Sequence, residues 1–217
     1  MMVICVLIRL SVVLGSQPKL IRIPKVRTIM DRIVVGITGA SGIPYGIRLL
    51  EVLKEFDVEV HLTCSPSASL VNDHEGDGKS WDEVLALADV VHDNGNLAAS
   101  ISSGSFKAKA MAIVPCSGTT LGKLAAGISD NLVTRSALVM LKERRPLILV
   151  PRETPLNTIY IDNMLQLSNA GAIIAPASPA FYNKPKTIDD NINFIVGRVL
   201  DLLAYDSEIF SRWEGTE

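Results

Sequence analysis

Cysteine and histidine are scarce in this chain, which limits the disulfide and metal chemistry open to it. Three cysteines and three histidines occur among the 217 residues, scattered along the sequence. An odd and sparse set of cysteines is no disulfide framework, and no pair or cluster has the spacing of a zinc site. We therefore expect no metal, and we expect each histidine to lie on the surface or in a satisfied core position.

Excess charge of one sign and long apolar runs are also missing. The 21 basic and 23 acidic residues give a formal net charge of −2, which argues against a general nucleic-acid-binding surface. The apolar stretch over residues 1–15 is interrupted by Arg9 and is too short to span a bilayer. It also fits a secretory signal poorly. We therefore expect no nucleic-acid partner, no membrane partner and a cytoplasmic location.

The first 30 residues differ in composition from the rest of the chain. They contain five Lys or Arg residues and no Asp or Glu. This pattern is compatible with an organelle transit peptide or with a start codon assigned too far upstream. We favour the second interpretation because Met30 directly precedes the first convincing strand. No linker divides the remainder, so we expect an N-terminal extension over 1–30 and a single domain over 31–217.

Strand and helix patterns alternate from residue 32 onward. Short β-branched apolar runs predict buried strands at 32–38, 57–65, 110–117, 145–153 and 172–178. Helical periodicity predicts helices at 44–56, 80–89, 118–128, 131–144, 157–171 and 187–203. Ser80 and Glu83 have the spacing of a capping box, and Gly171 stands where a helix commonly ends. The alternation predicts an α/β fold in which helices cover both faces of a parallel sheet.

Small and polar residues follow each predicted strand. In a parallel sheet, ligands bind beyond the carboxyl ends of the strands, and helix N-termini there favour anions such as phosphate. We therefore expect the polar stretches to gather along one edge. They are 36–42, 63–69, 115–122, 150–157 and 176–185.

The stretch "GITGASGIPYG" is rich in glycine and carries the hydroxyl of Ser41. It lacks the lysine of a P-loop, and its glycines do not follow the GxGxxG order. The second strand ends without an acidic residue, so the usual partner of a dinucleotide ribose is absent. A mononucleotide with one phosphate fits better, and FMN is the commonest such cofactor. The alternative is that these glycines only make tight turns.

Charged residues follow the fourth predicted strand and occupy the next helices. Arg152 and Glu153 come directly after a buried strand, so we expect them to be half-desolvated there. Arg152 suits phosphate binding or carbonyl polarisation, and Glu153 could transfer a proton if burial raises its pKa. A structural ion pair or a subunit contact explains them equally well. Arg135 and Lys142 share one helix face and could form a second anion clamp or be solvated charges.

Six stretches of this sequence closely resemble the flavin prenyltransferases, the UbiX-like family. They are "GITGASG", "SISSGSF", "PCSGTTL", "DNLVTR", "LKERRPLILVPRETPLN" and "PAFYNKP". The resemblance covers residues 32 to about 203. It implies a flavodoxin-like three-layer α/β/α fold and a homo-oligomer, often a dodecamer, with sites between subunits.

The resemblance also implies a reaction. Reduced FMN would be the substrate, and a dimethylallyl group from dimethylallyl monophosphate would be joined to flavin N5 and C6 without a metal. The product, prenylated FMN, would pass to a UbiD-like decarboxylase.

The resemblance implies a set of site residues as well. FMN would be held by Gly39, Ala40, Ser41, Ser65, Ser117, Gly118, Thr119, Thr120 and Arg152. Ser41, Glu75 and Glu153 would be the catalytic residues, with Ser41 near N5 and the two carboxyls moving protons. The prenyl phosphate would be surrounded by Arg135, Lys142, Tyr182 and Arg198, and Trp213 would stand at the place of a C-terminal aromatic lid. Many members have lysine where this chain has Thr119, so a charge near the flavin phosphate is missing.

Three other functions are compatible with the residues taken alone. An FMN-dependent cysteine-type decarboxylase shares the fold, although "PLNTIYIDNM" lacks its substrate motif. A non-catalytic FMN-binding regulatory subunit predicts flavin binding without turnover. A redox carrier predicts reversible flavin reduction and no binding of a prenyl phosphate.

Overall fold

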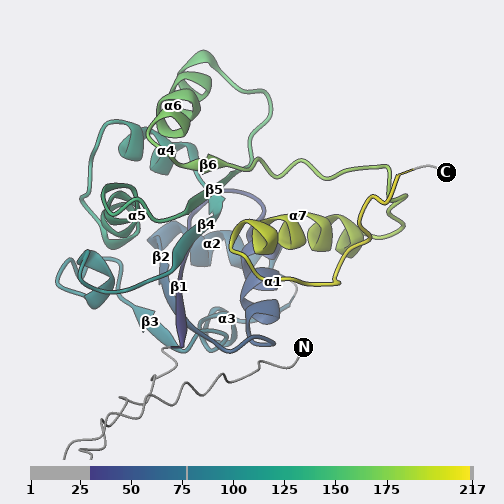
Figure 1. The fold of residues 1–217 in the computed structure, drawn as a ribbon, viewed down its shortest axis with the longest axis horizontal. Coiled ribbons are helices and arrows are strands. Elements are labelled where there is room, and N and C mark those ends of the chain that lie inside the picture. Colours follow the sequence, from purple (N-terminus) through teal and green to yellow (C-terminus); the bar gives the residue numbers. More distant parts are fainter. Residues whose placement is uncertain (1–29, 77, 216–217) are drawn as a thin grey trace, which may run out of the picture.

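The computed structural model of the protein describes residues 30–76 and 78–215. Its centre is a six-stranded parallel sheet with the strand order β3-β2-β1-β4-β5-β6 (Figure 1). The strands are β1 (Asp31–Ile37), β2 (Val58–Cys64), β3 (Val90–His92), β4 (Ala110–Cys116), β5 (Leu147–Pro151) and β6 (Ile173–Ile174). The expected extension over 1–30 lies outside the described residues except for Met30.

Helices cover both faces of this sheet, as the sequence predicts. They are α1 (Ile43–Leu53), α2 (Pro66–Glu75), α3 (Trp81–Leu85), α4 (Gly118–Ala125), α5 (Leu132–Lys142), α6 (Thr158–Asn169) and α7 (Ile188–Leu202), with a 3-10 turn η1 (Ser100–Ser102). Figure 1 shows α1 and α7 on one side of the sheet and α4, α5 and α6 on the other. The three-layer α/β/α architecture is therefore confirmed.

Side chains of β1 alternate between two apolar cores. Ile33, Val35 and Ile37 belong to the core that α1 and α7 close, whereas Val34 belongs to the core closed by α4 and α5. This alternation follows from the two-residue period of a strand. Because both faces are covered, the strand reads as a continuous apolar run, which is why the sequence pattern identified it.

The order of the strands reverses between β1 and β4. The chain leaves β1 toward β2 on one side and leaves β4 toward β5 on the other. The three-residue edge strand β3 aside, the order is that of flavodoxin-like folds. The crevice at this reversal is where such sheets bind their ligands.

Two elements escaped the sequence analysis, α2 and β3. Helix α2 buries only Ala68 and Asn72, so its ten residues show almost no apolar periodicity. Strand β3 has three residues, none of them fully buried. The capping box is confirmed, since the backbone N–H of Ser80 donates to Glu83 at 2.8 Å and that of Glu83 donates to Ser80 Oγ at 3.3 Å.

Candidate functional site at the carboxyl edge of the sheet

Thr38 ties the two turns that flank the reversal between β1 and β4. Its hydroxyl donates to the carbonyl of Pro115 at 2.8 Å and accepts from the backbone N–H of Ser117 at 2.8 Å. Thr38 is fully buried. The turn after β1 and the N-terminus of α4 are therefore held together, and the residues expected to contact one ligand share one edge.

Backbone geometry and contacts within the protein explain two glycines of the first turn. A Cβ on Gly39 would lie 2.3 Å from the Cβ of Ser67, so the turn can approach the first turn of α2 only without a side chain. The N–H of Gly39 donates to Ser65 Oγ at 3.1 Å. Gly42 has a φ of 108°, which disfavours any other residue. The close approach of this turn to α2 thus accounts for the glycine at position 39.

Ser41, Glu75 and Arg152 meet at this turn although they are far apart in the sequence. The backbone N–H of Gly42 donates to Glu75 Oε2 at 2.6 Å, and the Ser41 hydroxyl also donates to this carboxylate. Arg152 Nε donates to the carbonyl oxygen of Ser41 at 3.2 Å. The structure therefore brings together two of the three predicted catalytic residues and one predicted flavin contact.

Hydrogen bonding keeps the Glu75 carboxyl ionised. Burial raises its pKa most strongly, but the Ser41 hydroxyl, the N–H groups of Gly42 and Ile43, and the charge of Arg152 together hold the pKa below its usual range. Since the proton of the Ser41 hydroxyl is directed at Glu75, the Ser41 oxygen is left as an acceptor.

Tyr45 is a member of this site that the sequence analysis missed. Burial raises the pKa of its phenol, and the nearby charge of Arg152 opposes that rise. Its ring packs directly against Gly42. The only signal in the sequence is its position inside "GIPYG", one turn after the glycines.

The N-terminus of α4 forms the other side of the crevice. Ser117 caps the helix by accepting from the N–H of Thr120 at 3.2 Å, and the two hydroxyl oxygens lie 3.0 Å apart. Thr119 is exposed, and a Cβ on Gly118 would lie 2.1 Å from the ring of Tyr160 in α6. These hydroxyl groups and the helix terminus suit a phosphate. Tyr160, which covers this terminus, also escaped the sequence analysis.

Glu153 does not join this cluster. The expectation that Arg152 and Glu153 are half-desolvated is wrong in the single chain, since both are exposed. Strand β5 ends at Pro151, and the following segment extends past the sheet edge. Glu153 Oε1 accepts from the neighbouring N–H of Thr154 at 3.2 Å.

The four residues expected around the prenyl phosphate lie in different places of the single chain. All four are exposed. Arg135 and Lys142 both face the segment around η1, because Arg135 Nε donates to the carbonyl of Ser102 at 3.1 Å and Lys142 lies beside Gly104. The other two lie around α7.

The ring of Tyr182 contacts Phe194 and Trp213 edge-on, and Arg198 pairs with Asp201 at 2.8 Å. Trp213 therefore lies against Tyr182, as a C-terminal lid would. One chain alone does not gather the four expected phosphate ligands.

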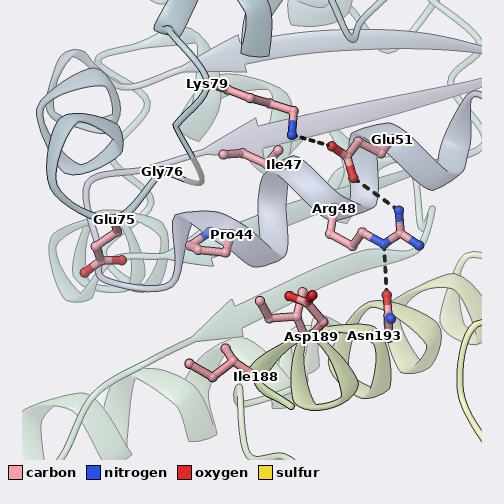
Figure 2. A pocket seen from close by; sticks show the side chains of 11 residues that line it. Pro44, Ile47, Arg48, Glu51, Glu75, Gly76, Lys79, Ile188, Asp189 and Asn193 are labelled. Carbon is pink, nitrogen blue, oxygen red and sulfur yellow. Dashed lines mark hydrogen bonds and ion pairs between the residues drawn. The ribbon is translucent and has the colours of Figure 1, made fainter.

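A cavity of about 590 Å³ opens behind Glu75, between α1 and the start of α7 (Figure 2). Its two cations are paired with one carboxylate, since Glu51 accepts from Lys79 at 3.0 Å and from Arg48 at 3.2 Å. Arg48 also donates to Asn193 of α7 at 2.9 Å. This chain of contacts joins α1 to α7 and to the loop after α2. Because its cations are already paired, the cavity is a poor anion site.

Comparisons with known proteins identify the family of this chain. The family model described as Flavoprotein matches residues 23–200. The flavin prenyltransferase UbiX of Thermoplasma acidophilum is 52% identical over 182 residues, which are 84% of this chain and 99% of that protein. The flavin prenyltransferase UbiX of Escherichia coli K12 is 50% identical over 86% of this chain and the whole of its own length.

The chain belongs to the flavin prenyltransferase family.

Solved structures give the same assignment. A structure of AnUbiX (PadA1) with FMN and dimethylallyl pyrophosphate has a TM-score of 0.85 and 48% identity, and covers 87% of this chain and all of that one. A dodecameric UbiX-like protein from Escherichia coli O157:H7 has a TM-score of 0.83 and 46% identity over 85% of this chain and all of its own. The peptidyl-cysteine decarboxylase EpiD, at 18% identity and a TM-score of 0.59, shares the fold alone.

Within residues 30–76 and 78–215, no group of three or more His, Cys, Asp or Glu side chains is placed to hold a metal ion. In the same part of the chain, no helix has both the length and the apolar character needed to cross a membrane.

Proposed function

We propose that this protein joins a dimethylallyl group from dimethylallyl monophosphate to N5 and C6 of reduced FMN. The observation that carries the proposal is the meeting of Ser41, Glu75 and Arg152 at the reversal between β1 and β4. A relative of known structure binds FMN together with dimethylallyl pyrophosphate. The preference for the monophosphate over the diphosphate is part of the proposal.

The residues of the carboxyl edge fit FMN. The α4 terminus with Ser117, Gly118, Thr119 and Thr120 would hold the phosphate or the ribityl chain, because its hydroxyl groups and N–H groups suit an anion. Gly39, Ala40, Ser41, Ser65 and Arg152 would hold the rest of the molecule. Reduced FMN would supply the two nucleophilic atoms, N5 and C6.

Ser41 and Glu75 form a short path for a proton. Glu75 is ionised, and the Ser41 hydroxyl donates to it, so the Ser41 oxygen can accept a hydrogen bond from the N5 region. A proton that reaches Ser41 can pass to Glu75. Glu153 would be the second base, for the proton lost at C6, once a neighbouring subunit covers its exposed carboxyl.

Arg135, Lys142, Tyr182 and Arg198 would stabilise the leaving phosphate. Breaking the allylic C–O bond leaves a carbocation and an anion, and cationic and phenolic donors stabilise that anion in a dry site. Since one chain does not gather these four residues, we propose that the site is completed between subunits. A homo-oligomer, a dodecamer as in one relative of known structure, would supply them.

The product would be handed to a UbiD-like decarboxylase, and a cytoplasmic location belongs to the same proposal. Neither the FMN-dependent cysteine-type decarboxylase nor the regulatory subunit accounts for identities near 50% with flavin prenyltransferases.

The test is a direct assay of the product. The purified protein is incubated without oxygen with dithionite-reduced FMN and dimethylallyl monophosphate, and the released flavin is measured by mass spectrometry. We expect a mass gain of one C5 unit, and a rate reduced by about 100-fold or more in Ser41→Ala and Glu75→Gln. Glu55→Gln, which changes an exposed carboxyl of the α1–β2 turn, is the matched control and should keep full activity.

Two outcomes would contradict the proposal. Flavin that binds and returns unmodified with both phosphate and diphosphate donors would favour the decarboxylase or the regulatory subunit. Full activity in Glu75→Gln would show that the Glu75 carboxylate is not part of the proton path.

A further inference from the structure

Four polar side chains outside the proposed catalytic cluster form a continuous chain across β1, β2 and β3. Arg32 Nε donates to Glu59 Oε2 at 2.9 Å, and Glu59 Oε1 lies 2.9 Å from His61 Nε2. His61 Nδ1 lies 2.9 Å from His92 Nε2. His61 is 3% exposed, and Phe106 packs edge-on against its ring at 4.9 Å. The proposed reaction uses none of these groups.

The two histidine rings lie side by side rather than face to face. Their planes differ by 14°, their centroids are 5.2 Å apart, and the facing nitrogens are 2.9 Å apart. A nitrogen separation so much shorter than the centroid separation places the bond close to the ring planes. This is the geometry of a strong N–H···N hydrogen bond, in which one nitrogen donates and the other accepts.

The charge of Glu59 sets the direction of the whole chain. The hydrogen bond from Arg32 lowers the pKa of Glu59 most strongly, so this carboxylate is ionised and can only accept. A neutral His61 then carries its proton on Nε2 and presents a bare Nδ1. His92 must in turn donate from Nε2, which leaves its own Nδ1 without a proton in the neutral ring.

The bare Nδ1 of His92 has no hydrogen-bond partner within residues 30–76 and 78–215. His92 lines a cavity of about 650 Å³ at the carboxyl edge, together with Cys64, Ser65 and Asn94. Ser65 also accepts from Gly39 of the turn after β1, so this cavity adjoins the proposed flavin site.

The cavity offers an acceptor rather than an anion site. The first N–H groups of α5 are already satisfied, because those of Leu132 and Val133 donate to the backbone and side-chain oxygens of Asn94. Asp93 adds a negative charge next to His92. A neutral ligand group that donates a hydrogen bond suits this environment better than a phosphate does.

We propose that Glu59, acting through His61, fixes His92 as a hydrogen-bond acceptor, and that this acceptor receives an O–H or N–H group of the bound flavin. Glu59 and His61 are positioning residues, and His92 is a binding residue. The identity of the ligand rests on the proposed function, whereas the direction of the hydrogen-bond chain does not. The donor is either a ribityl hydroxyl or the imide N–H of the flavin ring, which have the same hydrogen-bonding chemistry.

The first arm of the test needs no ligand. The chain has three histidines, so His74→Asn, which removes the exposed one, leaves a spectrum of the pair alone. Long-range ¹H–¹⁵N spectra at neutral pH should show both rings protonated on Nε2 and bare on Nδ1. Glu59→Gln should make the His61 tautomer mixed, because an amide can donate as well as accept. Nδ1 protonation of either ring in the unsubstituted pair would overturn the proposal.

The second arm measures flavin affinity with two matched variants of one residue. His92→Gln places its amide near the position of Nε2 and loses the acceptor in the cavity, whereas His92→Asn places an amide oxygen near the position of Nδ1. We expect the affinity for FMN to fall about 5- to 20-fold in His92→Gln, the loss of about one hydrogen bond or slightly more, and to fall less in His92→Asn. Equal affinity of both variants and the unsubstituted protein would refute the proposal.

Lumiflavin, which lacks the ribityl chain, separates the two sources of the donor. A loss in His92→Gln for both flavins assigns the donor to the ring, and a loss for FMN alone assigns it to the ribityl chain. If the unsubstituted protein binds no flavin, the proposed function fails, while the tautomer measurement still determines the direction of the hydrogen-bond chain. If it binds flavin and His92→Gln binds equally, the function stands and the inference fails.

Discussion

Gly39→Ala is the substitution whose effect the structure defines most closely. The added Cβ would lie 2.3 Å from the Cβ of Ser67, while the next nearest atoms of Ser67 lie at 3.3 Å. Real carbon contacts are not that short, so the turn after β1 and the first turn of α2 must move apart. The movement would also lengthen the 3.1 Å hydrogen bond from Gly39 N to Ser65 Oγ.

The size of the effect follows from these two losses. Overpacking a tight contact costs about 1–3 kcal/mol, and a lost hydrogen bond costs about 1 kcal/mol. We therefore expect Gly39→Ala to lower the free energy of unfolding by about 2–4 kcal/mol. For a chain of this size, the corresponding fall in Tm is about 4–16 °C. FMN binding should weaken as well, because Ser41 and Ser65 belong to the displaced segments.

A double-mutant cycle identifies the clash. Ser67→Gly removes the Cβ that the new methyl group would meet, at a cost of up to about 1 kcal/mol in helix propensity. In the combined variant, Gly39→Ala should cost at least about 1 kcal/mol less than it does alone. Urea unfolding and thermal melts measure both values. They are run at one fixed protein concentration, because the Tm of an oligomer depends on protein concentration.

Gly122→Ala in α4 is the matched control, because it should change the free energy of unfolding in the opposite direction. Its added Cβ would meet only Asn163 Nδ2 at 3.6 Å, an ordinary contact. Replacing a helical glycine by alanine should stabilise the protein by about 0.5–1 kcal/mol. The reasoning would be refuted if Gly39→Ala were as stable as the unsubstituted protein, or if Ser67→Gly gave it no relief.

Three further predictions concern the same edge of the sheet. Because the folded pKa of Glu75 is lowered, its contribution to stability is present at neutral pH and is lost as the pH falls through that pKa. In melts between pH 7 and pH 3, the Tm difference between the unsubstituted protein and Glu75→Gln should therefore shrink, and a constant difference would contradict the lowered pKa. Thr119→Lys places the charge that many family members have at the exposed start of α4. In fluorescence titrations it should raise FMN affinity a few-fold in low salt and by less in high salt, because salt screens the attraction to the phosphate. An equal gain at all salt concentrations would exclude a phosphate there. Burial raises the pKa of the Cys64 thiol to about 12 and also raises that of the fully buried Cys116. In a Cys5→Ser background, neither thiol should therefore react with a disulfide reagent at pH 8 until the protein unfolds, and rapid labelling of the native protein would refute this.

Much of the architecture could be predicted because it depends on local patterns. Apolar runs with β-branched residues predicted β1, β2, β4, β5 and β6, and the periodicity of the 187–203 segment predicted α7. The capping box at Ser80 was also local, since both partners lie within four residues. The elements that escaped are α2, which has almost no apolar periodicity, and β3, which has three residues, none of them fully buried.

The sequence by itself determined the family and the alternation that forces a parallel sheet, because long motifs and strand–helix order are properties of the chain alone. Only the tertiary structure decided which distant residues meet. It joined Ser41 to Glu75 and Arg152, left Glu153 exposed, and linked His61 to His92 across two strands. Such contacts depend on strand order, register and the close approach of α2 to Gly39, and no local pattern in a single sequence encodes them.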